Sequence, residues 1–91
     1  MKFIYPAVIS KDEAGNYQVR FPDLEGCTAS GDSLDEALDH ARDAQEGWIR
    51  VELEEGGELP HITDKEDIEL AEGEIVRNIS ANIRFFEGWD E

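Results

Sequence analysis

Residues 21–27, Phe-Pro-Asp-Leu-Glu-Gly-Cys, join two apolar segments through a run of turn-forming residues. Pro22 fixes its own backbone φ angle, and Gly26 can adopt a positive φ without steric strain. The carboxylate of Asp23 can accept hydrogen bonds from nearby backbone N–H groups, and we expect Leu24 to enter the core. The 21–27 motif therefore predicts a structural turn between two strands, with these motif residues: Phe21, Pro22, Asp23, Leu24, Gly26 and Cys27.

Three short strands are expected around this motif. Residues 2–10 are rich in β-forming side chains and apolar on both faces, so we expect this strand to be covered on both sides or to lie at an interface. Pro6 lacks an N–H, which predicts a bulge or an unpaired side there. Residues 17–21 alternate apolar and polar, and form a hairpin with the first strand. Residues 27–31 supply the third strand.

A helix follows the third strand. Ser33 and Glu36 have the spacing of a capping box, and Gly56 with Gly57 marks the helix end. Apolar residues recur at spacings of three and four, which predicts a buried stripe. Its members are Leu34, Ala37, Leu38, Ala41, Ala44, Trp48 and Val51.

The last expected strand is 74–83, after a charged loop at 58–73 that contains a helical turn near 65–70. The order β-β-β-α-β predicts an α+β fold, in which a three-stranded antiparallel meander is joined to a fourth strand by one crossover helix. A right-handed connection would make the last strand parallel to the strand before the helix. We expect a single domain at 1–84 and a tail at 85–91.

Composition limits the possible functions. The 91 residues are 40% hydrophobic, enough for one small core. The sequence has no run of about 18 apolar residues, so no membrane span is predicted. Its N-terminus does not resemble a signal peptide. A lone cysteine, Cys27, fits a reducing compartment, so we expect a cytoplasmic protein.

The charge is strongly negative and uneven. Of the net charge of −15, the first 31 residues contribute −1, from three basic and four acidic side chains, which leaves −14 on the other 60. Such a surface repels phosphate backbones, so we expect no direct nucleic-acid binding. It would attract a basic protein partner, although a merely solvated acidic face explains the charge equally well.

Catalytic groups are not arranged in any recognisable motif. His40 and His61 have no Cys or His at zinc-ligand spacing, so ordinary surface histidines are favoured, and Cys27 is expected to be a small buried side chain. The abundant carboxylates leave open a degenerate metal-dependent nuclease as an alternative. We expect no enzyme, no cofactor and no metal.

Three segments together resemble a known family: residues 5–9 (YPAVI), the 21–27 motif (FPDLEGC) and residues 31–37 (GDSLDEA). They look like the N-terminal domain of the HicB antitoxin family, and the similarity spans about residues 3–80. The resemblance implies a partial ribonuclease-H-like fold, and a type II antitoxin that binds and neutralises a small, RNA-cleaving toxin of the HicA type. Since RNA-binding toxins are basic, the acidic charge is complementary.

The resemblance leaves other functions open. Family antitoxins often add a C-terminal DNA-binding domain, for which the sequence after the last strand is too short, so the sequence leaves promoter binding open. An orphan homo-oligomeric adaptor is an alternative, and a dimer or tetramer is expected in either case. The candidate partner-binding residues are Asp39, Asp43, Glu46, Tyr5 and Val8.

Overall fold

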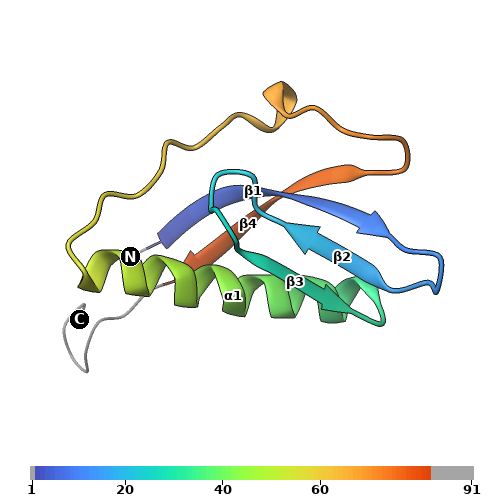
Figure 1. Ribbon diagram of the computed structural model, residues 1–91, viewed down its shortest axis with the longest axis horizontal. Helices are drawn as coiled ribbons and strands as arrows, with labels where there is room; N and C mark the ends of the chain where they lie inside the picture. The colour runs from blue at the N-terminus through green and yellow to red at the C-terminus, as the bar shows by residue number, and fades with distance from the viewer. Residues whose placement is uncertain (1, 83–91) are drawn as a thin grey trace.

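The computed structural model describes residues 2–82 as a four-stranded sheet with one long helix against one face (Figure 1). The predicted order β-β-β-α-β and the α+β class are confirmed, and a turn of 3-10 helix, η1, lies in the predicted loop. Residue 83 of the predicted last strand and the predicted tail 85–91 lie outside the described residues. The bounds are β1 Lys2–Lys11, β2 Tyr17–Arg20, β3 Thr28–Gly31, α1 Leu34–Glu54, η1 Lys65–Asp67 and β4 Ile75–Asn82.

The direction of β4 differs from the prediction. The strands lie in the order β3-β2-β1-β4, and every neighbouring pair is antiparallel. β4 pairs with β1 from Ile75 opposite Ile9 to Asn82 opposite Lys2, so it also runs antiparallel to β3. The expectation of a parallel last strand was wrong because the long connection 55–74 leads the chain back to the end of the molecule where α1 begins (Figure 1).

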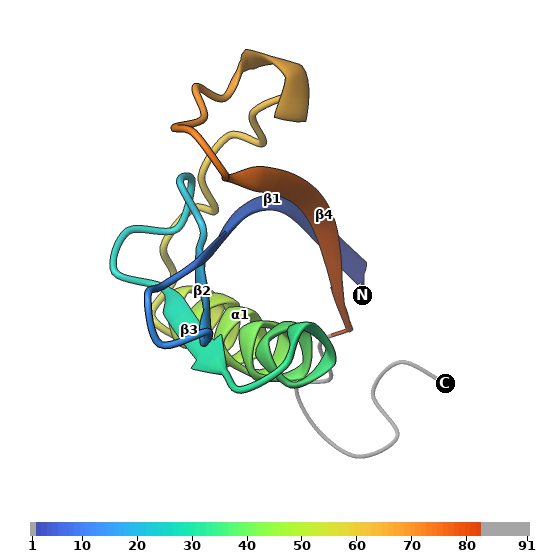
Figure 2. The ribbon, with the colours of Figure 1, turned by 90° about the vertical axis from the view of Figure 1, so that its right-hand side faces the viewer.

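The connection 55–74 also passes over part of the sheet face that α1 leaves open, next to β1 and β4 (Figure 2). Val8 of β1 points to this outer face and is only 1% exposed. It lies beside Arg20, whose guanidinium is 3.7 Å from the carboxylate of Glu74 at the end of the connection. On the outer face of β1, a single chain therefore buries Pro6 and Val8. The apolar surface expected there is reduced to Ile4, which is 41% exposed.

Pro6 occupies a part of β1 that β2 does not reach. The β1–β2 ladder ends at Val8 opposite Arg20, while Pro6 stands opposite Asn78 of β4. The missing N–H therefore leaves no gap in the β1–β2 ladder, and the predicted unpaired side of the strand is confirmed.

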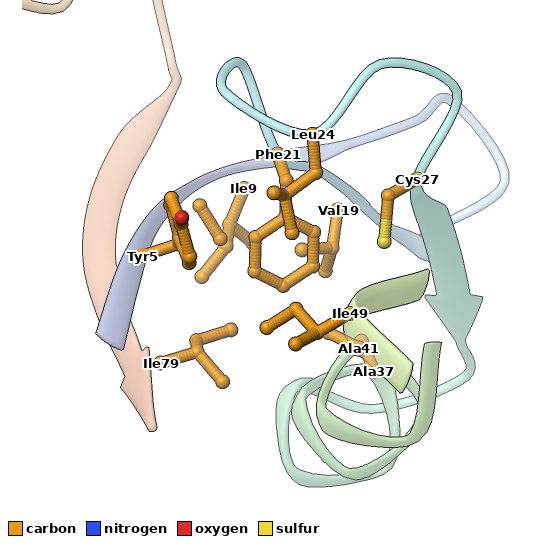
Figure 3. Close-up of a cluster of buried hydrophobic side chains, with 11 residues drawn as sticks. Tyr5, Ile9, Val19, Phe21, Leu24, Cys27, Ala37, Ala41, Ile49 and Ile79 are labelled. Atoms are coloured by element: carbon orange, nitrogen blue, oxygen red, sulfur yellow. The ribbon is translucent and has the colours of Figure 1, made fainter. Parts of the chain in front are cut away.

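The core lies between the sheet and α1 (Figure 3). Ala37 and Ala41, both 0% exposed, are small enough to let the helix approach the strands closely. Gly31 at the end of β3 is closest: a Cβ on this residue would lie 2.5 Å from the backbone nitrogen of Ala37, so only glycine fits. Figure 3 shows the larger side chains that fill the space between them: Tyr5, Ile9, Val19, Phe21, Leu24, Ile49 and Ile79.

The ends of α1 follow the predicted sequence signals. Ser33 Oγ accepts a hydrogen bond from Glu36 N at 3.1 Å, as the capping box requires. The Glu36 carboxylate accepts in return from Asp32 N at 2.7 Å, one residue further back than the usual box. At the other end Gly56 has a φ of +76°, the left-handed conformation that terminates helices.

The buried line of α1 departs from the predicted stripe. Gln45 and Ile49 are 0% exposed, although neither was assigned to the stripe, whereas Val51 is 51% exposed. The Gln45 amide donates to the carbonyl oxygens of Ile79 at 3.0 Å and Phe3 at 3.4 Å, and so bridges β4 and β1. Its Oε1 atom has no partner among residues 2–82. A pattern of apolar residues could not find this position because its side chain is polar.

Candidate functional site

The 21–27 motif folds into two consecutive turns. Phe21 O accepts from Leu24 N, and Leu24 O accepts from Cys27 N, each at 3.0 Å. Phe21 N donates to Cys27 O at 3.1 Å and closes the loop, and Gly26 has a φ of +79°. The side chains of Phe21, Leu24 and Cys27 are buried, so the motif is anchored in the core from both ends and the middle.

Two polar contacts tie this motif to distant parts of the chain. Both carboxylate oxygens of Asp23 accept from Thr63 in the connection, one from the backbone N at 2.8 Å and the other from Oγ1 at 2.7 Å. The indole N–H of Trp48 on α1 donates to Glu25 O at 2.9 Å. From the sequence, Asp23 was expected to accept only from nearby N–H groups. Neither its bonds to Thr63 nor the bond from Trp48 to Glu25 was predicted. The motif therefore joins β2 and β3 to the helix and to the connection.

Burial keeps two titratable groups near the motif in their neutral forms. The Tyr5 hydroxyl donates to Pro60 O at 2.7 Å, and its pKa is raised first by burial and second by the negative charge of Asp23. The pKa of the Cys27 thiol is raised by burial alone. A buried, protonated thiol is a poor nucleophile, so Cys27 acts here as a core side chain.

One of the carboxylates, Asp12, and one of the two histidines, His40, have hydrogen-bond partners in the backbone. Asp12 accepts from Asn16 N at 2.9 Å and from Ala14 N at 3.0 Å, and the bond from Asn16 is the main cause of its lowered pKa. His40 Nδ1 lies 2.7 Å from Ser30 O on β3. Within residues 2–82, no three His, Cys, Asp or Glu side chains lie close enough to hold a metal ion, and no helix is long and apolar enough to cross a membrane.

A shallow groove of about 520 Å³ runs between the 21–27 motif and the exposed side of α1. Its lining is mainly apolar, and Glu52 stands at its edge. Val51, which the apolar stripe had predicted to be in the core, lines this groove and is 51% exposed. The principal lining residues are Cys27, Thr28, Ala44, Gly47, Trp48 and Val51.

The candidate partner-binding residues fall into two groups. Asp39 and Asp43 are exposed on α1, where Asp39 lies 3.4 Å from an Arg42 guanidinium nitrogen, and Glu46 on the same helix is half-buried. Tyr5 and Val8, by contrast, are each only 1% exposed, because Tyr5 belongs to the core and the outer face over Val8 is covered within the chain. Of these candidates, the helix acids are therefore accessible to a partner, whereas Tyr5 and Val8 are buried.

Together these features define a small α+β domain whose polar groups organise its turns and whose surface combines an apolar groove with exposed acids. The family model described as the HicB-like antitoxin of bacterial toxin–antitoxin systems matches residues 5–82. The chain belongs to this family, and the resemblance inferred from the 21–27 motif is confirmed.

Solved structures share the fold. A chain of a toxin–antitoxin complex from Streptococcus pneumoniae superposes with a TM-score of 0.81 at 22% identity, over 90% of this chain and 70% of that one. The N-terminal domain of the Burkholderia pseudomallei antitoxin HicB gives 0.75 at 22% identity, over 85% and 95%. A chain of the HicA3 and HicB3 toxin–antitoxin complex gives 0.66 at 27% identity, over 90% and 99%.

A curated relative is longer than this chain. An uncharacterised 14.9 kDa protein from the rep-hol intergenic region of Haemophilus phage HP1 is 42% identical over 57 residues. The match covers 63% of this chain but only 42% of the phage protein. The shared region is thus less than half of that relative.

Proposed function

We propose that this chain is the antitoxin of a type II toxin–antitoxin system, and that it binds and neutralises a small, basic, RNA-cleaving toxin of the HicA type. Membership of the HicB-like antitoxin family over residues 5–82 carries the proposal. The similar chain in the HicA3 and HicB3 complex, almost fully covered by this one, supports the same kind of partner. The charge of −14 after residue 31 suits a basic partner.

Neutralisation in this proposal is non-covalent. The antitoxin covers part of the toxin surface and performs no reaction, so we propose that it is not an enzyme. The roles of the candidate groups agree, since Cys27 is buried and Asp12 stabilises a turn. We further propose that residues 1–84 form the functional domain, with 85–91 as its tail, and that it acts in the cytoplasm, where an RNA-cleaving toxin finds its substrate.

We also propose that two or four copies associate through the edge of the sheet formed by β4. This eight-residue edge strand, IVRNISAN, contains one arginine and no acidic residue, whereas the whole chain carries −15. This strand therefore brings no acidic side chains together when copies meet along it, and unpaired edge groups readily pair with another strand. Ile4 and Ile62 next to it are 41% and 50% exposed and supply apolar contact.

Sedimentation at about 10 μM, where standard-sized interfaces are normally populated, tests the association. The wild type should sediment as a dimer or tetramer, and Ile4→Glu with Ile62→Glu should shift it towards monomer. Both residues lie at the surface, 41% and 50% exposed, so the variant should keep the wild-type circular dichroism spectrum. A monomeric wild type would contradict self-association.

Co-expression tests the antitoxin role. A small, basic, RNA-cleaving protein encoded beside this chain should arrest growth when expressed alone, and this chain should relieve the arrest and co-purify with it. Continued arrest with no complex would refute the proposal and favour the orphan adaptor. Metal-dependent RNA cleavage by the purified chain would instead favour the nuclease.

A further inference from the structure

The groove beside the 21–27 motif contains a glycine that the fold does not require. Gly47 lies well inside α1, where glycine is less favourable than alanine by about 1 kcal/mol. A Cβ placed on it would meet nothing within 4 Å, and its φ is not positive. Neither packing nor backbone conformation within residues 2–82 explains a glycine here. What its missing side chain does provide is depth in the groove.

The groove offers a fixed apolar surface. Trp48 forms one wall, and its indole N–H is already donated to Glu25 O at 2.9 Å, which holds the ring in place and leaves only apolar atoms to a partner. Val51, one helical turn after Gly47, is 51% exposed. Rigid aromatic walls of this kind are typical of the positions that anchor protein interfaces.

Acidic side chains surround this apolar surface. Glu52 lines the groove, and Glu25 is exposed in the adjoining turn. Asp43 and Glu54 are exposed on α1, and their spacing of four and seven residues from Gly47 places them on the same side of the helix. Arg50 offsets part of this charge, but the last helical turn has no basic residue. A second copy of this chain would be repelled here, whereas a basic surface would be attracted.

We propose that the groove lined by Gly47, Trp48 and Val51 is the docking site for the basic toxin, which inserts one large apolar side chain while its surrounding Lys and Arg residues meet the acidic rim. This inference rests on the proposed antitoxin function and adds the surface through which it acts. The apolar contact fixes the lifetime of the complex, and the rim acids raise the association rate.

Gly47→Leu tests the site, with Gly47→Ala as its matched control. Both replace a helix-interior glycine by a better helix former in open space, so both should fold at least as stably as the wild type. Only leucine fills the groove. The probe is the small basic toxin encoded beside this chain, in a variant that no longer cleaves RNA, and the readout is its dissociation rate from immobilised antitoxin. Gly47→Leu should raise this rate about tenfold or more, as for the loss of an interface anchor, and Gly47→Ala less than about twofold.

Two further measurements separate this site from the rest of the helix. Asp35→Leu places the same side chain in the first turn of α1, outside the groove, and should leave the dissociation rate within about twofold of wild type. In a Trp89→Phe background, the emission of Trp48 should shift to shorter wavelength when the inactive toxin binds, because its exposed face loses water. If the wild type binds but Gly47→Leu dissociates no faster than Gly47→Ala, or Trp48 emission does not shift, the docking site is wrong and the antitoxin role stands. If the wild type does not bind the toxin, both the docking site and the proposed antitoxin function are wrong.

Discussion

Replacing Asp23 by Ala removes the link between the 21–27 motif and the connection 55–74. The two carboxylate oxygens accept from Thr63 N at 2.8 Å and from Thr63 Oγ1 at 2.7 Å. Hydrogen bonds to charged groups contribute about 1.5–3 kcal/mol each, at the lower end where water can replace the lost acceptor. Since this site is only partly buried, we expect Asp23→Ala to lower the free energy of unfolding by about 2–3 kcal/mol.

Urea denaturation followed by far-ultraviolet circular dichroism measures this loss. Thr63→Val is the matched control: it removes the hydroxyl donor, keeps the backbone N–H, and should cost about 1 kcal/mol. In the double variant the second substitution should add little, because the hydroxyl has then already lost its acceptor. A loss below about 0.5 kcal/mol for Asp23→Ala, typical of an ordinary surface substitution, would refute the assignment of the motif as the junction of the fold.

The same substitution should change the titration of Tyr5. Burial is the larger cause of the raised pKa of Tyr5, and the charge of Asp23 adds to it, so Asp23→Ala should lower this pKa while leaving it above its ordinary value. Tyrosinate absorbance in a Tyr17→Phe background isolates Tyr5. Because the folded-state pKa is raised, the stabilisation from protonated Tyr5 is complete below about pH 10, the unfolded value, and is lost as the pH rises through the folded value. An unchanged Tyr5 titration would contradict the electrostatic contact.

Three further tests address the fold and the charged surface. Ser33→Ala should lower the free energy of unfolding by about 1 kcal/mol through the lost helix cap, and an unchanged denaturation midpoint would exclude the cap at this residue. Gly31→Ala should cost about 3 kcal/mol because its Cβ meets helix backbone, whereas Gly47→Ala, in open space, should stabilise by about 0.5–1 kcal/mol; equal effects would refute the close approach. Asp39→Lys with Asp43→Lys should slow toxin association, more at low salt than at high salt, with little change in dissociation; faster dissociation alone would contradict steering.

Local chemistry allowed much of the fold to be predicted. The proline and glycine of the 21–27 motif, the cap formed by Ser33 and Glu36, and the helix end at Gly56 each depend on residues only a few positions apart. The direction of β4 could not be predicted in this way. It depends on how far the connection 55–74 carries the chain before the strand begins, and a rule for compact crossovers does not apply to such a long segment.

Long-range polar contacts were the second part that the sequence could not provide. Asp23 and Thr63 are 40 positions apart, and Gln45 reaches carbonyl groups on two strands 34 and 42 positions away. None of these three spacings follows a local period, since such contacts exist only once the sheet and helix have come together. The sequence could name Asp23 as a turn residue but could not identify its partner.

The error at Val51 is informative about the candidate site. Its spacing continues the apolar stripe of α1, so the pattern placed it in the core, but the structure leaves it 51% exposed beside Gly47 in the groove. Two local rules are broken at this place in α1. Val51 has the spacing of a buried apolar residue but is exposed, and Gly47 is a glycine inside a helix that the fold does not need. Because natural sequences tend to break such rules where another molecule binds, this is the part of α1 where a partner is best expected. In the proposed docking, the acids around this groove select a basic partner and the groove holds its apolar side chain.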